Sequence, residues 1–472
     1  MPTSTILFAL GFSAVCVAAL FNPIWGVVGY TGDYNIGPQL QWWEKPLEGL
    51  GIRYSFVLAA FTGVGMVLHI RNLRCGRPLL SRLEFFVLLM LGCVWLSVLL
   101  GGPTQGRYTV IDHPSVKFTK VVIFAMMLTH VVTTRRRFDI LMWALVIGSL
   151  VLGYQAFNTP RAQFNRGRLE TVGGPDFREA NVLAAYLAGM LPLIGAQFLR
   201  SKWLGKAVCM ASGALAVNAI VLTRSRGAMV GLVVAMGIAV LFAPRRHRMK
   251  ILACLIVAAV GGWMLTDPGF WLRASTVTGG QDQYDSSTQS RWEIWQGGLR
   301  MFKAHPLGVG VGNFYQTIGS FAREHQGRDA HNSFVRCLCE LGFQGIAVYM
   351  AVLAGSIWSL WRVMQRVRQL PQAQQDRTLY ACYGALVSIF TLLGCSLTVT
   401  LLYLEGMWWI LLLPVCLRRV EANLLEEQKV LAVAQTPPGG KAPRGDISRF
   451  RRRRGTGAAP PPFPKSSGTS AT

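Results

Sequence analysis

His331 lies where a polar segment meets a long hydrophobic stretch, at the start of the string HNSFVRCLCELGFQG. The unperturbed pKa of histidine is about 6.5, so an imidazole here can be neutral and accept a proton at ordinary pH. Nearby arginines would favour this neutral form. A lone histidine is more often structural than catalytic. Because this one starts a helix at the expected membrane surface, after a basic and polar segment, we treat it as a candidate general base.

Glu340 lies on the same predicted helix, nine residues beyond His331. At about 3.6 residues per turn, this spacing puts the two side chains on opposite sides of the helix, so Glu340 is not a simple partner of His331. A carboxylate at this depth must be paired, and it is a functional candidate by default. Substrate binding and a structural pairing with another helix both remain open for Glu340.

Two arginines form the second candidate group. Arg224 and Arg226 flank Ser225 in a very short connection between two apolar segments, and Gly227 follows. Arginine side chains at helix ends can simply extend to the membrane surface. The alternative is a clamp for phosphate or pyrophosphate, because guanidinium groups bind phosphate in a bidentate manner and a helix N-terminus attracts anions.

Other candidates lie on either side of this pair. Asn181 is placed to cap a helix, and it could also face the site. Arg291 begins the string RWEIW on a predicted helix and could reach back toward a ligand. The glycine-rich string HPLGVGVG, which starts at His305, has no strand–turn–helix setting and no P-loop Lys-Ser/Thr. It is therefore interpreted as a tight turn.

The elements that must position these residues are membrane-spanning helices. The chain has 472 residues, of which 52% are hydrophobic and only 15% are charged. Because a span needs about 20 apolar residues, the sequence predicts about twelve transmembrane helices in an all-α polytopic membrane domain over 1–420. The predicted spans lie near 4–21, 51–70, 83–101, 116–132, 138–156, 181–199, 204–222, 227–243, 249–266, 334–360, 378–399 and 402–417.

The distribution of the +25 net charge sets the predicted orientation and argues against a nucleic-acid partner. Basic residues gather in alternate connections, which the positive-inside rule places in the cytoplasm together with both termini. These connections are 71–82, 135–137, 200–206, 245–250 and 362–377. Residues 421–472 are predicted to be a disordered basic cytoplasmic tail. The ten cysteines lie mostly in spans, so we expect no disulfide framework.

The segments expected outside are 22–50, 101–115, 157–180, 223–226, 267–333 and 400–405, and the two long ones, 157–180 and 267–333, are rich in arginine. Positive charge outside the cell is opposite to what the positive-inside rule predicts, so an anionic ligand on that face is the natural explanation. The sequence has no Walker motif, no Asp-x-Asp pair and no zinc motif, so we expect no cofactor and no metal. The substrate should then carry its own activation, as a lipid pyrophosphate does.

In these strings the chain resembles the O-antigen ligase and polymerase superfamily, whose members share a Wzy-type C-terminal region. The resemblance covers roughly 180–345 and rests on the order and spacing of the strings. They are NVLA from Asn181, RSRGA from Arg224, Arg291 with Trp295, HPLGVG from His305, and HNSF from His331 with Glu340-Leu-Gly.

The resemblance implies a membrane-embedded glycosyltransferase of the GT-C-like class, with a large extracytoplasmic loop before helix 10 and no metal. It would move a glycan from undecaprenyl pyrophosphate to an acceptor hydroxyl on the periplasmic face of the bacterial inner membrane. His331 would be the base, while Arg224, Arg226 and Arg291 would hold the pyrophosphate. Partners would be the lipid-linked glycan, membrane lipids and a glycolipid, polysaccharide or protein acceptor.

Among the superfamily's activities we favour O-antigen ligase, because one long outside loop precedes His331. A polymerase of O-antigen or exopolysaccharide and a protein O-oligosaccharyltransferase are the alternatives. A transporter of an organic or lipid anion is an alternative of another class. We see no repeat between the halves of the sequence, as many transporters have, which favours the enzyme.

Overall fold

A computed structural model of the chain describes residues 2–70, 73, 79–103, 109, 111–165, 167–243, 248–265, 286–368, 370 and 372–434. These residues form helices and contain no strand, apart from one isolated bridge between Asn165 and Arg168. The helices before the long outside segment are α1 (Thr3–Phe21), α2 (Ile24–Ile36), α3 (Lys45–Glu48), α4 (Tyr54–Leu68), α6 (Arg82–Leu100), α7 (Pro114–Val131), α8 (Arg135–Asn158), α9 (Ala180–Arg200), α10 (Trp203–Thr223), α11 (Arg226–Phe242) and α12 (Arg248–Leu265).

The later helices are α14 (Ser286–Ala304), α15 (Phe314–Phe321), α16 (Ser333–Val367), α17 (Gln372–Ser396) and α18 (Glu405–Ala434). Short 3-10 turns interrupt the connections. They are η1 (Pro38–Leu40), η2 (Arg161–Gln163), η3 (Pro175–Arg178) and η6 (Arg323–His325).

Seven helices within the described ranges are long and apolar enough to cross a membrane, namely α1, α6, α8, α9, α10, α16 and the part Gln375–Ser396 of α17. Large apolar side chains remain exposed on the outer faces of such helices, for example Leu7, Leu99 and Trp203. An exposed apolar surface of this extent is typical of contact with lipid. Two further expected spans coincide with the shorter apolar helices α4 and α11. The protein is thus a polytopic helical membrane protein, and the count of twelve stays a prediction.

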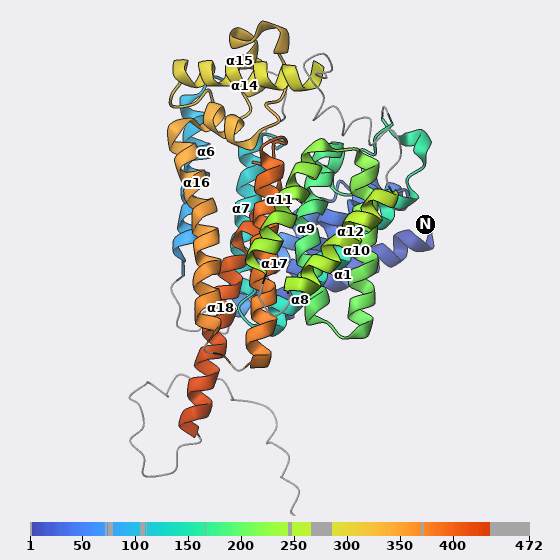
Figure 1. The fold of residues 1–472 in the computed structure, drawn as a ribbon. Helices are drawn as coiled ribbons and strands as arrows, with labels where there is room; N and C mark the ends of the chain where they lie inside the picture. The colour runs from blue at the N-terminus through green and yellow to red at the C-terminus, as the bar shows by residue number, and fades with distance from the viewer. Residues whose placement is uncertain are drawn as a thin grey trace, which may run out of the picture. The chain divides into compact units, whose positions relative to one another are not determined.

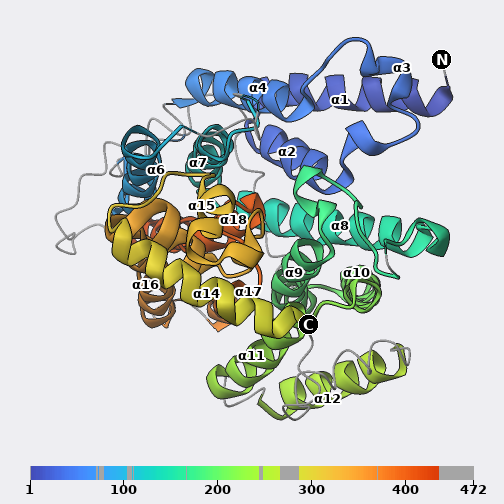
Figure 2. The ribbon, with the colours of Figure 1, turned by 90° about the horizontal axis from the view of Figure 1, so that it is seen from above.

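The bundle has a lateral order. Helix α17 packs on α9 and α11, α10 packs on α9 and α8, and α16 packs on α6. Seen from above, α1 and α4 lie at one edge and α11 and α12 at the opposite edge (Figure 2). Helix α14 lies across one end of the bundle, nearly perpendicular to α16, and contacts it (Figure 1). The candidate residues of α14 are therefore held above the start of α16.

Helix α2 lies within the segment 22–50, which was expected to be an outside connection. It packs against α8, α4 and α1, with Ile24, Val27 and Tyr30 buried. Its polar residues made the segment look like a loop, but they are paired within the protein. The Asn35 side chain, for example, donates to the Thr31 carbonyl at 2.7 Å.

The segment between α8 and α9 is anchored to the bundle through Asp176. This carboxylate accepts hydrogen bonds from Tyr34 of α2 at 3.0 Å and from the backbone N–H of Glu405 at 3.2 Å, and it pairs with Lys117 of α7. Three elements far apart in sequence thus hold η3 in place. Because η3 directly precedes α9, they also position Asn181.

Helix α16 is broken at Gly342, whose φ of 70° and ψ of −167° are not helical. The glycine-rich turn, predicted to be a tight turn, docks at this break. The Val309 N–H donates to the Cys339 carbonyl at 2.9 Å, and the Gly310 N–H donates to the Glu340 carbonyl at 3.2 Å. A Cβ on Gly308 would lie 2.4 Å from the Glu340 carbonyl oxygen, so only glycine permits this approach. The turn therefore satisfies carbonyls that the break releases from the helix.

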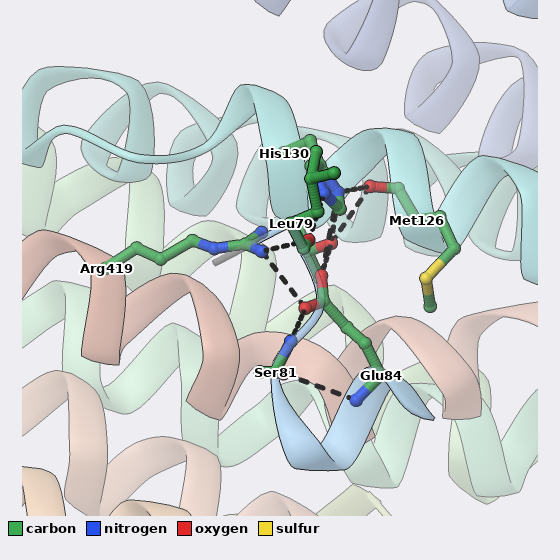
Figure 3. A network of polar contacts seen from close by, with 7 residues as sticks. Leu79, Ser81, Glu84, Met126, His130 and Arg419 are labelled. Atoms are coloured by element: carbon green, nitrogen blue, oxygen red, sulfur yellow. Dashed lines mark hydrogen bonds and ion pairs between the residues drawn. The ribbon is translucent and has the colours of Figure 1, made fainter. Parts of the chain in front are cut away.

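A polar network holds the N-terminal end of α6 (Figure 3). Glu84 is fully buried, and it accepts hydrogen bonds from the Ser81 N–H at 2.7 Å and from Arg419 of α18 at 3.0 Å. His130 of α7 lies 3.6 Å from the same carboxylate. The other end of α6 reaches the break in α16, where the Ser97 hydroxyl donates to the Glu340 carbonyl at 2.6 Å. Helix α6 thus ties the two ends of the bundle.

The chain divides into two compact units, Met1–Asn423 and Leu424–Thr472. In the second unit the described residues, 424–434, are helical. The tail expected over 421–472 thus begins as helix, and its remainder, including the run Arg451 to Arg454, lies outside the described residues. Arg71, Arg74, Arg77 and residues 245–247 of the connection 245–250 also lie outside them. The eight cysteines whose side chains are described are free and buried.

Candidate functional site

His331 is held at the start of α16 by the contacts of the two residues that follow it. The next residue, Asn332, caps the helix, because its side-chain oxygen accepts hydrogen bonds from the N–H groups of Phe334 and Val335 at 2.9 and 3.1 Å. The hydroxyl of Ser333 then donates to the Val399 carbonyl at 3.1 Å and accepts from the Leu401 N–H at 2.8 Å. The connection between α17 and α18 therefore fixes the point where His331 enters the helix.

The backbone of His331 is in the left-handed region, with φ of 44°. Arg224 has the same conformation, with φ of 50°. The described residues contain only one other residue besides glycine with positive φ, Thr171. Left-handed backbone costs a residue with a side chain about 1–2 kcal/mol, and strain of this kind gathers at functional sites. Two of the residues that the sequence singled out therefore share an unusual conformation.

Asp329 connects His331 to a buried polar network. One carboxylate oxygen lies 3.6 Å from Nδ1 of His331, and the other accepts a hydrogen bond from Arg336 at 3.0 Å. Burial alone would raise the pKa of Asp329, but the charges of Arg336 and His331 outweigh it and hold the pKa below its usual value. Asp329 is thus ionised at neutral pH and keeps a negative charge beside the imidazole.

Arg336 is itself fixed from several sides. Its guanidinium donates to Glu340 at 3.1 Å and to the Tyr315 hydroxyl at 2.8 Å, and it lies over the Tyr315 ring at 4.6 Å. Glu340 is fully buried, and its second oxygen accepts from the Tyr403 hydroxyl at 2.7 Å. Glu340 therefore pairs one turn back on its own helix, and its contacts reach His331 only through Arg336 and Asp329.

The Arg224–Arg226 turn is built by two helix ends. Arg224 caps α10 at its C-terminus, and Ser225 caps α11 at its N-terminus by accepting from the Ala228 N–H at 3.4 Å. Behind the turn, a Cβ on Gly227 would meet the Thr398 hydroxyl at 2.5 Å, so α11 begins tightly against the connection that also holds Ser333. The turn and the start of α16 are positioned by one and the same segment.

Asn181 links this turn to a further arginine. Its side-chain oxygen accepts from the Ser225 hydroxyl at 3.0 Å and from Arg168 at 2.7 Å. Asn181 lies in the first turn of α9 and makes no capping bond. The N-cap is Glu179, so the expected capping role is wrong. The asparagine instead joins α9, the 224–226 turn and the segment before α9.

Arg168 is a member of the site that the sequence did not single out. Its Nε donates to the Thr223 carbonyl at 2.9 Å, and the Leu169 N–H donates to the Leu222 carbonyl at 3.1 Å. These bonds fix Arg168 against the end of α10. In the sequence it is one of several arginines in 157–180, and no spacing distinguishes it from the others.

Arg291 of α14 joins the same group of charges. Burial lowers its pKa, and the nearby charges of Arg226 and Arg168 lower it further. Three guanidinium groups from three separate elements thus lie close enough to repel one another. The charge of Asp329 opposes these shifts. Because guanidinium groups bind phosphate well, the group of arginines marks a candidate site for an anion.

His331 lines the same cavity as Arg291 of this basic cluster. Its pKa is lowered mainly by burial, Asp329 opposes that shift, and Arg291 adds to it. The side chain remains 32% exposed, so a ligand can reach it. A cavity of about 570 Å³ opens between α14 and the segment before α16, with Arg291, Asp329 and His331 in its wall. A neutral imidazole beside a cluster of cations can take a proton while an anionic group leaves.

The structure brings together Arg226, Arg291 and His331, and it places Asn181 of α9 against the turn that carries Arg224. Glu340 lies below them in the network. The match with known families falls on this region: residues 211–350 match a family model described as O-Antigen ligase. This part of the chain is therefore similar to the O-antigen ligase family. The resemblance to the O-antigen ligase and polymerase superfamily is thereby confirmed.

The matched residues 211–350 include all the predicted site residues except Asn181, which precedes them together with Arg168. The family indicates an enzyme of the glycosyl-transfer type with ligase or polymerase activity. The comparison with curated proteins finds no match. The contacts of Asn181 and Arg168, which precede the matched residues, are seen in this structure.

Proposed function

We propose that the protein transfers a glycan from undecaprenyl pyrophosphate to an acceptor hydroxyl, with O-antigen ligase as the favoured activity. Arg224, Arg226 and Arg291 bind the pyrophosphate, and Arg168 contributes to the same positive field. His331 is the general base. The observation that carries this proposal is the meeting of the basic cluster with a partly exposed imidazole whose pKa is lowered by burial.

The proposed reaction is a single displacement. The acceptor oxygen attacks the anomeric carbon of the donor sugar, the bond from that carbon to the pyrophosphate oxygen breaks, and the hydroxyl proton passes to His331. Because Asp329 lies on the Nδ1 side of the ring, Nε2 is the atom that takes the proton. The electron pair leaves with undecaprenyl pyrophosphate, whose charge the arginines stabilise. This displacement inverts the configuration at the anomeric carbon.

The orientation of the site is proposed from the two ends of α10. Arg224 ends this helix, whereas the basic residues Lys202 and Lys206 lie at its start. By the positive-inside rule the start of α10 faces the cytoplasm, so the site faces the periplasm of a bacterial inner membrane. Both termini would then be cytoplasmic.

The experiment is glycan analysis of cells that lack the protein and are then given the wild type or a variant. His331→Ala and Arg226→Ala test the base and the donor cluster. Arg161→Ala is the matched control, because Arg161 is an exposed arginine of η2 in the same segment as Arg168. Membrane levels of each variant are measured by immunoblot.

The expected result is a lipid-linked glycan that accumulates on deletion and persists with both site variants, while Arg161→Ala restores transfer. The length of the glycan and the identity of the molecule that lacks it separate ligase, polymerase and protein transferase. Full rescue by both site variants would show that the proposed site is wrong. A deletion that changes no glycan would instead favour the transporter of an organic or lipid anion.

A further inference from the structure

A second cavity lies at the other end of the bundle from the candidate site, with a volume of about 380 Å³. Leu79, which precedes the start of α6, is in its wall. The far end of α6 reaches the network below His331, where the Ser97 hydroxyl bonds to the Glu340 carbonyl. The cavity is therefore separate from the proposed reaction, and its volume lies within the usual range for ligand sites.

The long walls of this cavity are two apolar stripes on neighbouring helices. Residues three or four apart share one face of a helix, and both stripes have this spacing. The stripes are Gly63, Met66 and Val67 of α4 with Ile70 just after it, and Ile123 and Met127 of α7. Val67 is 69% exposed and Ile123 is 52% exposed, so the cavity opens on the apolar outer surface of the bundle. A lipid therefore reaches it without leaving the bilayer.

The polar groups of the cavity wall gather at one end, where the network of Figure 3 lies. Nε2 of His130 contacts the Leu79 carbonyl at 2.8 Å, and Arg419 donates to Glu84 at 3.0 Å. Thr133 is the third polar side chain of the wall, whereas Glu84 is fully buried behind it. Among the described residues the wall thus presents a guanidinium, an imidazole and a hydroxyl but no carboxylate. This end of the cavity suits a negatively charged group.

The order of these groups along α7 matches that of a membrane lipid. Ile123 and His130 are seven residues apart, which is about 10 Å along a helix axis. Helix α7 ends one residue after His130, and α8 begins at Arg135. The polar end therefore lies at a membrane surface, the one proposed above to be cytoplasmic, and the apolar walls extend from it toward the bilayer centre. A phospholipid has its headgroup and acyl chains in the same order.

We propose that the cavity between α4 and α7 binds an anionic phospholipid from the leaflet opposite to the candidate site. One acyl chain lies between the two apolar stripes, and the headgroup lies at the end that holds Arg419. Basic pockets between membrane helices bind acidic lipid headgroups in this way. Exposed arginines at the same end of the bundle, Arg82 and Arg136, add positive charge. This lipid is distinct from the proposed donor, whose pyrophosphate lies at the other membrane surface.

The test is native mass spectrometry of the full-length protein in detergent, with phosphatidylglycerol and phosphatidylcholine that carry the same acyl chains. Val67→Trp and Ile123→Trp fill the cavity from opposite walls, so one variant remains if the other fails to fold. Val64→Trp is the matched control, because Val64 lies on the same helix as Val67, is 51% exposed and is outside the cavity wall. Thermal unfolding of each protein, with and without lipid, is measured in parallel.

The wild type and Val64→Trp should each retain one phosphatidylglycerol and bind phosphatidylcholine roughly tenfold more weakly, since its choline cation meets a basic surface. Val67→Trp and Ile123→Trp should bind phosphatidylglycerol roughly tenfold more weakly, as the loss of about two buried methylene groups implies. Phosphatidylglycerol should also raise the unfolding midpoint of the wild type and of Val64→Trp more than that of the two filled variants.

Phosphatidylglycerol that binds the filled variants as tightly as the wild type would overturn the site. Phosphatidylcholine that binds as tightly as phosphatidylglycerol would overturn the choice of an anionic headgroup. Oleate that binds where phosphatidylglycerol does not would assign the cavity to a free fatty acid and overturn the phospholipid. Because the cavity and the candidate site lie at opposite ends of α6, each of these outcomes leaves the proposed transfer reaction as it stands.

Discussion

Asp329 contacts His331 and Arg336 with different oxygens of one carboxylate, at 3.6 Å from the imidazole Nδ1 and 3.0 Å from the guanidinium. Asp329, which lies beside the proposed base, is therefore itself held in place by the buried guanidinium of Arg336. Asp329 acts through His331 as a positioning residue. Its negative charge raises the pKa of the imidazole against the effect of burial.

Asp329→Asn should lower the transfer rate, and it should move the acidic limb of the pH–rate profile to lower pH. Activity requires neutral His331, so it falls as the pH drops through the pKa of that imidazole. Asparagine removes a charge that raises this pKa, and the acidic limb of the profile moves to lower pH. A weaker base also lowers the maximal rate, by roughly tenfold or more. A full pH–rate profile checks both effects, and a limb that stays in place would show that Asp329 does not act through His331.

Arg291→Gln should shift the same limb in the opposite direction. The charge of Arg291 lowers the pKa of His331, so its removal raises that pKa and activity is lost at higher pH than in the wild type. The donor KM should also rise by roughly tenfold, because a charge-assisted contact with pyrophosphate is lost. Arg300→Gln, an exposed substitution on the same helix, is the control. A limb that moves to lower pH would contradict the assigned sign.

Arg224→Gly and Arg224→Ala should differ in stability and agree in activity. Both remove the guanidinium, so donor binding should weaken equally. The φ of 50° at this position suits glycine and strains alanine, so the glycine variant should be more stable by about 1 kcal/mol. Thermal unfolding in detergent compares the two midpoints. An alanine variant that is as stable as the glycine variant would mean that the left-handed backbone relaxes when the side chain is removed.

Arg336→Met should destabilise the protein strongly, because it leaves Asp329 and Glu340 without their shared cation. Breaking a buried ion pair from one side costs about 3–5 kcal/mol. Adding Glu340→Gln and Asp329→Asn should recover part of the stability, since no buried charge is then left unpaired. The yield of folded protein and its unfolding midpoint measure the effect. A single variant as stable as the triple variant would show that the network contributes little.

Hydropathy predicted the positions of most spans, because α1, α6, α8, α9, α10, α16 and α17 are continuous apolar stretches. It missed α2, whose Tyr34 and Asn35 interrupt the apolar pattern. These polar groups are tolerated because the Tyr34 hydroxyl donates to Asp176 and the side-chain oxygen Oδ1 of Asn35 accepts from the Tyr186 hydroxyl at 3.0 Å. Such partners lie more than a hundred residues away in the chain, so no local pattern reveals them.

The sequence predicted only part of the site, because some site residues are also positioned by distant partners. Arg226, Arg291 and His331 stood in recognisable strings, and the structure places them together. Arg168 had no local signature, since its place depends on bonds to Thr223 and Asn181. Arg336 did have one: its spacing of four residues from Glu340 within an apolar helix is that of an ion pair.

The break at Gly342 has a consequence for how the enzyme meets its membrane. The first turns of α16 are fixed by Val309, Gly310 and Ser97, which bond to their carbonyls. Beyond the break, the Phe343 N–H donates to the Pro306 carbonyl of the same glycine-rich turn at 3.0 Å, so both sides of the break are tied to one turn. A helix in a thinner or thicker bilayer adjusts by tilting. We expect a tilt of α16 to carry the glycine-rich turn and the imidazole with it.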